Sequence, residues 1–152
     1  MAEIVLARAW CNNEVAYLAW KTDGRIDGCL GFMITRIHLD TGERRILPTW
    51  VAFDTQSNPD WDEQDTSVWQ VQKFSWRDLT LRRSRNTRAV RGSFRARYEI
   101  VPVGRPAPGR APVPPSATVQ PGKYKGKSIA LFFCGRSIQI NEIKVTGDFG
   151  DI

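Results

Sequence analysis

Short segments in which apolar and polar residues alternate constrain the fold of this chain more than any other feature of its sequence. Ala16, Leu18 and Trp20 take every second position, and Phe32 and Ile34 share a face in the same way. Apolar residues do not recur at the helical spacing i, i+3, i+4, i+7 over any stretch of about twelve residues. The sequence therefore predicts an all-β protein of short strands, either a sandwich or a barrel.

Turn-rich joints separate the segments that carry this strand pattern. The expected strands are 4–10, 14–20, 30–39, 44–47, 69–74, 95–103 and 137–145. The first segment also contains the helix-favouring residues Ala and Leu. We nevertheless predict a strand there, because Cys11, Asn12 and Asn13 lead directly into the next strand.

Three places in the sequence predict departures from regular strands. Gly42 ends an Asp-Thr-Gly sequence between two apolar runs, so we expect a short hairpin with a positive φ at this glycine. Pro102 lacks a backbone donor, which predicts a bulge or an unpaired edge beside it. The apolar phase shifts between Ile140 and Ile143, which predicts a second bulge.

The chain of 152 residues has the length of one domain. Three stretches interrupt the strand pattern: 53–68 is acidic and polar, 82–93 is rich in arginine, and 104–127 is rich in proline and glycine. We expect all three to be inserted loops outside the core. Without them about 100 residues remain, the size of an immunoglobulin-like sandwich. We therefore predict a single β-sandwich domain over 1–152.

Neither a membrane span nor a signal peptide is predicted. The longest purely apolar run is 129–134, whereas a spanning helix needs roughly 20 residues, and the N-terminus lacks the apolar stretch of a leader. Cys11, Cys29 and Cys134 show no C-x-x-C spacing, which argues against zinc or thioredoxin-like chemistry. We expect a cytoplasmic protein whose thiols are buried as small apolar residues.

The positive charge of the chain is concentrated in one segment. The formal net charge is +6, but residues 77–97 alone contribute +7, from eight arginines and Asp78, and the rest of the chain contributes −1. The opposite extreme is 54–65, which holds five acidic residues and no basic one. This asymmetry indicates a local basic surface rather than a basic protein.

Four segments in chain order resemble strands of a fibronectin type III domain. They are 15–20 with its core tryptophan, 31–36, 74–79 and 98–103. The resemblance implies an immunoglobulin/fibronectin type III-like antiparallel β-sandwich with long loop insertions, and Trp20, Phe32, Ile34 and Tyr98 are expected inside it. Tyr98 would be the corner tyrosine, whose hydroxyl bonds to nearby backbone.

A narrower resemblance covers most of residues 10–104. The segments 13–20, 29–36, 40–43, 56–61, 71–79 and 97–102 resemble the N-terminal region of large bacterial phospholipase D-like proteins. In that family the sandwich precedes domains with an H-x-K-x-x-x-x-D motif. Here the single histidine, His38, is followed by Leu39 and Asp40, so the motif is missing, and the chain departs from the family within 82–95 and 104–137. The resemblance implies a piece of a larger protein whose catalytic motifs lie downstream of residue 152.

The sequence predicts no catalytic residue, no cofactor and no metal site. The acidic segment has no His, Lys or Cys beside it for acid–base chemistry. For calcium, Asp60, Asp62 and Asp65 offer oxygen ligands, but Asp65 stands at the glycine position of an EF-hand loop and Val71 at its glutamate position. By strand parity His38 falls on the core side, where we expect a hydrogen-bonded structural residue.

The arginine run is the sharpest candidate for binding. Its side chains could neutralise phosphates of a nucleic acid or an anionic surface: Arg82, Arg83, Arg85, Arg88 and Arg91. Aromatic residues are scarce around the run, since only Phe94 lies near it, so the sequence does not support a base-stacking platform for single strands. The alternative is a solvated loop that pairs with the acidic segment of the same molecule.

Two functions follow from these sequence features. The first is a non-catalytic accessory or interaction module that precedes phospholipase D-like domains and contacts those domains or a protein partner. The second is a module that binds nucleic acid or an anionic surface through the arginine run 82–91. We do not expect enzymatic activity within this chain.

Overall fold

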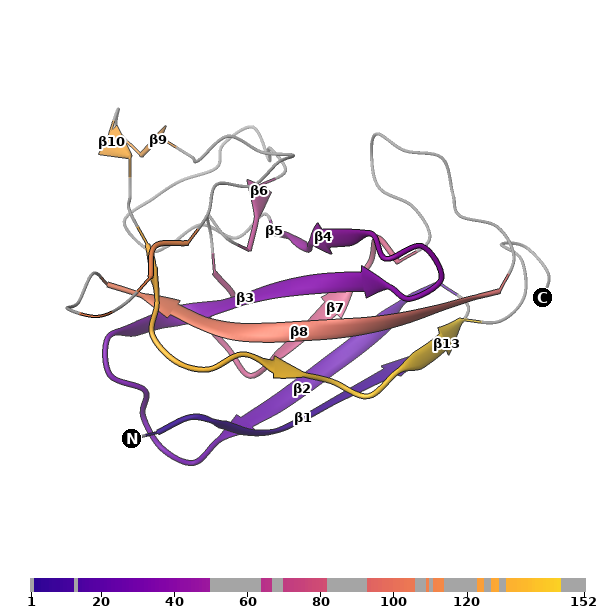
Figure 1. The fold of residues 1–152 in the computed structure, drawn as a ribbon, viewed down its shortest axis with the longest axis horizontal. Coiled ribbons are helices and arrows are strands. Elements are labelled where there is room, and N and C mark those ends of the chain that lie inside the picture. Colours follow the sequence, from indigo (N-terminus) through magenta and orange to yellow (C-terminus); the bar gives the residue numbers. More distant parts are fainter. Residues whose placement is uncertain are drawn as a thin grey trace.

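The computed structural model describes residues 2–12, 14–49, 64–66, 70–81, 93–105, 109, 111–113, 123–124, 127–128 and 131–145. All regular elements within these ranges are β-strands (Figure 1). In chain order they are β1 (Ile4–Cys11), β2 (Ala16–Thr22), β3 (Cys29–His38), β4 (Arg44–Ile46), β5 (Pro48–Thr49), β6 (Gln64–Asp65), β7 (Ser75–Asp78), β8 (Phe94–Gly104), β9 (Lys123–Tyr124), β10 (Lys127–Ser128), β11 (Phe132–Phe133), β12 (Ile138–Gln139) and β13 (Ile143–Val145). No helix in the described ranges could span a membrane.

Two antiparallel sheets pack against each other and confirm the predicted β-sandwich (Figure 1). The first sheet has the order β1-β2-β7, and the second has the order β11-β8-β3-β4, with β12 and β13 also paired to β8. Two small ribbons, β5-β6 and β9-β10, complete the described strands. The segment 4–10 is strand and not helix, as predicted.

The long strand β8 organises the second sheet. One side of it pairs with β3 along nearly the whole strand, and the other side pairs in turn with β13, β12 and β11. Its alternate residues Phe94, Ala96, Tyr98 and Ile100 are buried in the main core. This is the alternation that the sequence showed over 95–103.

Pro102 lies where the partner of β8 is interrupted. The β11 pairing ends at Val103, and the β12 pairing begins at Ile100. Pro102 therefore needs no donor for a ladder, while its carbonyl accepts the Cys134 amide at 3.0 Å. A Cβ at Gly135 would come within 2.7 Å of the Pro102 ring, so this glycine lets the chain pass over the proline. The predicted irregularity is thus a gap between two short partner strands.

The predicted bulge near the C-terminal strands is confirmed. Between Gln139 and Ile143 the chain gains one residue relative to β8. Asn141 lies in this irregular stretch, and its side-chain amide bridges to β1: Oδ1 accepts the Ala9 amide at 3.0 Å, and Nδ2 donates to the Ala9 carbonyl at 3.1 Å. The Asn141 side chain therefore joins the two sheets at this seam.

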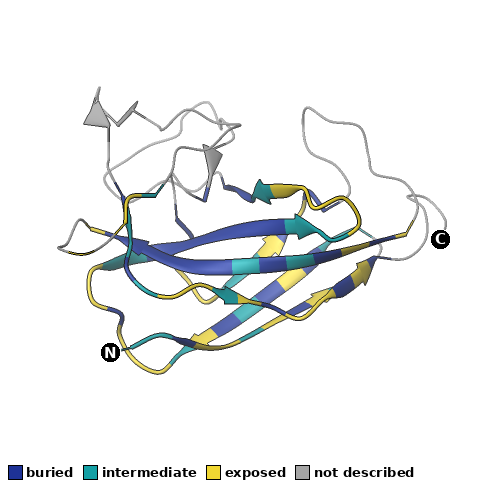
Figure 2. Ribbon diagram, in the orientation of Figure 1, coloured by how far each residue is buried: buried dark blue, intermediate teal, exposed yellow. Residues whose placement is uncertain are grey.

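The strand β3 is buried on both faces, as Figure 2 shows by its dark colour. Phe32 and Ile34 face the main core between the sheets, together with Trp20 and Tyr98. On the opposite face Met33 packs in a smaller cluster with residues from the neighbouring strand and from later in the chain: Val101, Val103 and Leu131. Burial on both sides explains why the apolar run of β3 is nearly continuous rather than alternating.

Gly42 has φ +77°, which confirms the predicted hairpin turn between β3 and β4. The strand expected at 69–74 is wrong. Within it Val71 makes only an isolated bridge to Phe32, and the strand that joins the first sheet is β7, at Ser75–Asp78. Hydrogen bonds in both directions join the backbones of Val71 and Phe32 at 2.9 Å, which fixes Val71 to the second sheet and leaves pairing with β2 to the next residues.

The expectation that the inserted stretches lie outside the core fails at three described residues, of which Gly104 is the buried last residue of β8. Thr66, within 53–68, is fully buried, and its hydroxyl accepts the Ile34 amide at 2.9 Å and donates to the Ile34 carbonyl at 3.2 Å. Thr66 therefore covers a residue of β3 that β4 does not pair with. Val113, within 104–127, is half-buried against the second cluster. Most of 53–68, 82–93 and 104–127 lies outside the described residues.

Candidate functional site

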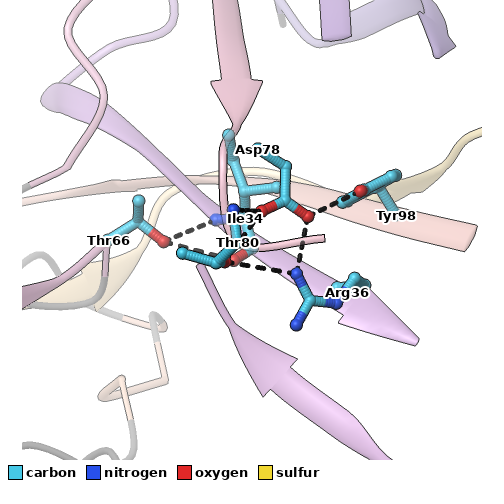
Figure 3. A network of polar contacts seen from close by, with 6 residues as sticks. All are labelled: Ile34, Arg36, Thr66, Asp78, Thr80 and Tyr98. Atoms are coloured by element: carbon cyan, nitrogen blue, oxygen red, sulfur yellow. Dashed lines mark hydrogen bonds and ion pairs between the residues drawn. The ribbon is translucent and has the colours of Figure 1, made fainter. Parts of the chain in front are cut away.

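A buried polar network lies between the two sheets (Figure 3). Asp78 on β7 is its centre, and its carboxylate accepts hydrogen bonds from Arg36 Nη1 at 2.6 Å and from the Tyr98 hydroxyl at 2.7 Å. Its other oxygen accepts the backbone amide and the hydroxyl of Thr80, at 3.0 and 2.8 Å. Since Arg36 belongs to β3 and Tyr98 to β8, the network cross-links the first sheet to the second.

The electrostatics of this network are those of a closed structural site. Burial of Tyr98 and the neighbouring Asp78 carboxylate raise the pKa of the phenol well above its ordinary value of 10.0. Burial lowers the pKa of Arg36, but Asp78 and the phenol outweigh it, and the net pKa is raised. Tyr98 and Arg36 therefore both stay protonated, and the Asp78 carboxylate accepts four hydrogen bonds. The network thus holds the two sheets together rather than transferring protons.

Tyr98 differs in one respect from the corner tyrosine that the resemblance implied. Its hydroxyl donates to the Asp78 side chain, not to nearby backbone. The position is nevertheless fully buried, as are its neighbours Leu18 and Ile34. The sequence could place Tyr98 in the core by alternation, but it could not identify a partner twenty residues away on another sheet.

Within the described part of the chain, the surroundings of His38 are those of a structural residue. Its ring stacks on Phe94, with centroids 4.9 Å apart and planes 17° apart. Among the described residues its buried Nδ1 has no hydrogen-bond partner. The ring is thus packed by stacking, while the backbone of His38 is hydrogen-bonded to Glu43, Thr41 and Gly42. No group of three or more His, Cys, Asp or Glu residues in the described part of the chain is placed to hold a metal.

The expectation of buried thiols holds for one of the three cysteines. Cys134 is buried, whereas Cys11 and Cys29 are half-buried at the border of the main core. The Cys11 thiol lies 3.4 Å from the Lys144 carbonyl, to which it donates, and burial raises its pKa. A raised pKa disfavours the reactive thiolate. Cys11 therefore fits the expected structural role better than a nucleophilic one.

A shallow hollow of about 200 Å³ lies at the end of the sandwich between the β2–β3 turn and the residues before β7. Its lining includes the basic residues Arg25 and Lys73, the exposed ring of Phe74, and Cys29. Lys73 already directs its ammonium group at Trp76, 5.5 Å from the ring centroid. The hollow thus combines positive charge and apolar surface without a carboxylate in its lining.

The most unusual surface of the described molecule is the outer face of the first sheet. Register places one row of side chains across all three strands, Trp10, Tyr17 and Arg77, and a second row with Arg8, Ala19 and Ser75. A third row holds Leu6 and Lys21. We call the larger exposed side chains of these rows the aromatic–cationic face: Leu6, Arg8, Trp10, Tyr17, Lys21 and Arg77.

The aromatic rings of this face are open to solvent. Trp10 is 55% exposed and Tyr17 is 42% exposed, and their ring centroids lie 6.0 Å apart with a tilt of 32°. The small inward residues Ala7 and Ala9 explain this placement, because they let β1 approach the core closely and leave the larger residues of opposite parity outside. In strands β1, β2 and β7 the one acidic residue is Asp78, which faces inward.

Sequence reasoning missed this face. Among the tryptophans of the first sheet, the sequence placed only Trp20, which is buried as predicted, whereas Trp10 is exposed. The parity that Trp10 shares with Arg8 could have indicated an outward direction. The sequence-predicted binding residues Arg82, Arg83, Arg85, Arg88 and Arg91 lie outside the described residues, as do Asp60 and Asp62.

Comparison of the chain with protein-family models, with curated proteins and with solved structures finds no match.

Proposed function

We propose that this chain is a non-catalytic interaction module that binds an anionic partner on the aromatic–cationic face. The observation that carries the proposal is the composition of that face: three cations, two exposed aromatic rings and no carboxylate on one three-stranded surface. Exposed aromatic side chains gathered on one face are typical of interaction surfaces, whereas single exposed apolar residues need no explanation.

The cations of the face are available to a partner. None of the ion pairs among the described residues involves Arg8, Lys21 or Arg77. By contrast, Arg36, Arg44 and Arg95 all pair with carboxylates elsewhere in the molecule. Three like charges on one side of a thin sheet create a positive potential that attracts anions and accelerates their association.

The arginine run adds to the same proposal from the sequence. It starts at Arg82, directly after Leu81 and four residues beyond the end of β7 at Asp78. The run contributes five arginines to the chain downstream of the strand that carries Arg77. This order in the chain supports an anionic partner, whether the run or the face makes the larger contribution.

The setting that we propose for this module is next to phospholipase D-like domains, on the resemblance over residues 10–104. In that setting the sandwich would bring an anionic substrate or partner to domains that carry the chemistry. We therefore expect the isolated chain to show no turnover of a generic phosphodiester. Turnover that survives repurification and disappears with a point substitution in this chain would overturn this part of the proposal.

Retention on a heparin column during a salt gradient tests the proposed function. The double variant Arg8→Glu/Arg77→Glu should elute at clearly lower salt than the wild type, because it reverses two charges of the face. The matched control is Arg136→Glu/Lys144→Glu, which makes the same change in net charge at two exposed positions away from the first sheet, one between β11 and β12 and one on β13. Equal loss of retention by both double variants would show an effect of net charge alone and would contradict a binding face.

A further inference from the structure

We infer that the anionic partner of the aromatic–cationic face is a single-stranded nucleic acid, with bases stacked on Trp10 and Tyr17 and phosphates held by Arg8, Lys21 and Arg77. This inference rests on the proposed function and narrows it to one class of partner. Positive charge alone attracts any polyanion, so the choice depends on the aromatic pair and on its place among the cations.

The exposed rings of Trp10 and Tyr17 are suited to binding planar ligands by stacking. Trp10 and Tyr17 are register partners on β1 and β2, so the sheet itself sets their separation, with ring centroids 6.0 Å apart. Both rings are exposed over about half of their surface. Every nucleobase has an aromatic face, and stacking of bases on such side chains tolerates any sequence. A duplex keeps its bases stacked inside, so the pair favours a single strand.

The cations lie where the backbone of a stacked strand would pass. Arg77 is the register partner of Tyr17, so it extends the aromatic row by one strand, a step of about 4.8 Å. Arg8 is the outward-facing residue before Trp10 on β1, and Lys21 lies two outward positions beyond Tyr17 on β2. The small residues Ala19 and Ser75 separate these groups across the sheet. The face therefore offers two stacking sites bordered by three phosphate sites.

An acidic protein segment is the main competing occupant. Its carboxylates could pair with the same cations, and the chain itself contains such a segment at 54–65, most of it outside the described residues. A carboxylate does not stack on the exposed rings of Trp10 and Tyr17, whereas a nucleobase does. The dependence of binding on Trp10 and Tyr17 therefore separates the two occupants.

Titration of a labelled oligothymidylate of fifteen nucleotides with the whole chain, followed by fluorescence anisotropy, measures the affinity and tests the inference. Trp10→Ala and Tyr17→Ala should each weaken binding on the order of 5- to 150-fold, the range for loss of one stacked base. Both residues are exposed, so we expect these variants to fold, which circular dichroism checks. Phe74→Ala is the matched control, because it removes another exposed aromatic ring away from the face; it should leave the affinity unchanged.

The salt dependence distinguishes the stacking groups from the charged ones. Arg77→Ala should make the log–log slope less steep by about 0.7, the value for one phosphate of a single strand. Trp10→Ala should lower the affinity and leave the slope unchanged, because stacking releases no counterions. A duplex of the same length should bind more weakly than the single strand, and its binding should not depend on Trp10.

Two results would overturn the inference. In the first, Trp10→Ala and Tyr17→Ala bind the oligonucleotide as tightly as the wild type does. In the second, polyglutamate binds with the same dependence on Trp10, which identifies an acidic protein segment as the occupant. In either case a heparin retention that still depends on Arg8 and Arg77 would leave the proposed function standing. Loss of that dependence would remove the proposed function itself.

Discussion

Substitution of Asp78 by asparagine tests whether the network between the sheets is the polar centre of the fold. The Asp78 carboxylate is inaccessible to solvent and pairs with Arg36, whose side chain is only 10% exposed. The amide keeps the shape of the carboxylate but removes its charge, so Arg36 remains as a buried cation without a counter-ion. Removal of one charged partner from a buried ion pair costs about 3–5 kcal/mol, and we expect Asp78→Asn to lower the free energy of unfolding by that amount.

A double variant gives this prediction its control. In Arg36→Met/Asp78→Asn no buried ion is left over, and the amide oxygen at position 78 can still accept hydrogen bonds from Tyr98 or Thr80. We expect this double variant to cost less than Asp78→Asn alone, since it leaves no buried cation without a counter-ion. Glu99→Gln breaks the more exposed pair with Arg44 and should cost about 0–1 kcal/mol.

Urea unfolding followed by tryptophan fluorescence measures all of these variants, and an unchanged m-value shows that the same structure unfolds. The reasoning would be refuted if Asp78→Asn cost less than about 1 kcal/mol. It would also be refuted if the cost of the double variant equalled the sum of the costs of the single substitutions. Either result would mean that the charges are solvated rather than held between the sheets.

Three further predictions concern single positions. Because its pKa is raised above 10.0, folded Tyr98 stays protonated where an unfolded tyrosine ionises, so the stability that it contributes is present below pH 10 and is lost as the pH rises above it. Absorbance titration of tyrosinate should show a late-ionising phenol that Tyr98→Phe removes, and the alkaline decline in unfolding free energy should be shallower in that variant. Gly104→Ala should prevent normal packing, because a Cβ there would overlap the Gly28 carbonyl oxygen. At Gly109 a Cβ would meet no atom within 4 Å, so Gly109→Ala should lower the free energy of unfolding by only about 1–2 kcal/mol, because of the positive φ. Thermal unfolding compares the two variants. Trp20→Ala should cost roughly 3–5 kcal/mol in urea unfolding, and a loss below about 1 kcal/mol would show that the cavity collapses around the missing ring.

The alternation of apolar and polar residues predicted those strands of the sandwich that have one buried face and one solvent-exposed face. The period of two in β2 and the phase shift before Ile143 depend on neighbouring residues only, so the sequence contains them in full. The sequence failed where a distant segment decides the outcome. Thr66 lies in a polar stretch, yet it is buried because its hydroxyl satisfies both backbone groups of Ile34.

The two polar surfaces were predictable to different degrees. Asp78 looks like an ordinary surface residue in the sequence, and only the fold brings Arg36 and Tyr98 to it from two other strands. The aromatic–cationic face was more accessible to sequence reasoning, because Arg8 and Trp10 share a parity on one strand. Register with Tyr17 and Arg77 is a property of the paired sheet, and no local pattern specifies it.

The seam between Ala9 and Asn141 has a consequence for the behaviour of the protein at high concentration. Strand β1 pairs only with β2, and an unpaired strand border is a template on which another chain can add a strand. The Asn141 amide occupies both backbone groups of Ala9 in the middle of that border, as a bound strand would. The Asn141 amide thus helps to block intermolecular β-pairing, together with the Cys11 thiol, which donates to the Lys144 carbonyl of the neighbouring β13. Loss of the Asn141 amide would promote aggregation through β1 even where the fold itself survives.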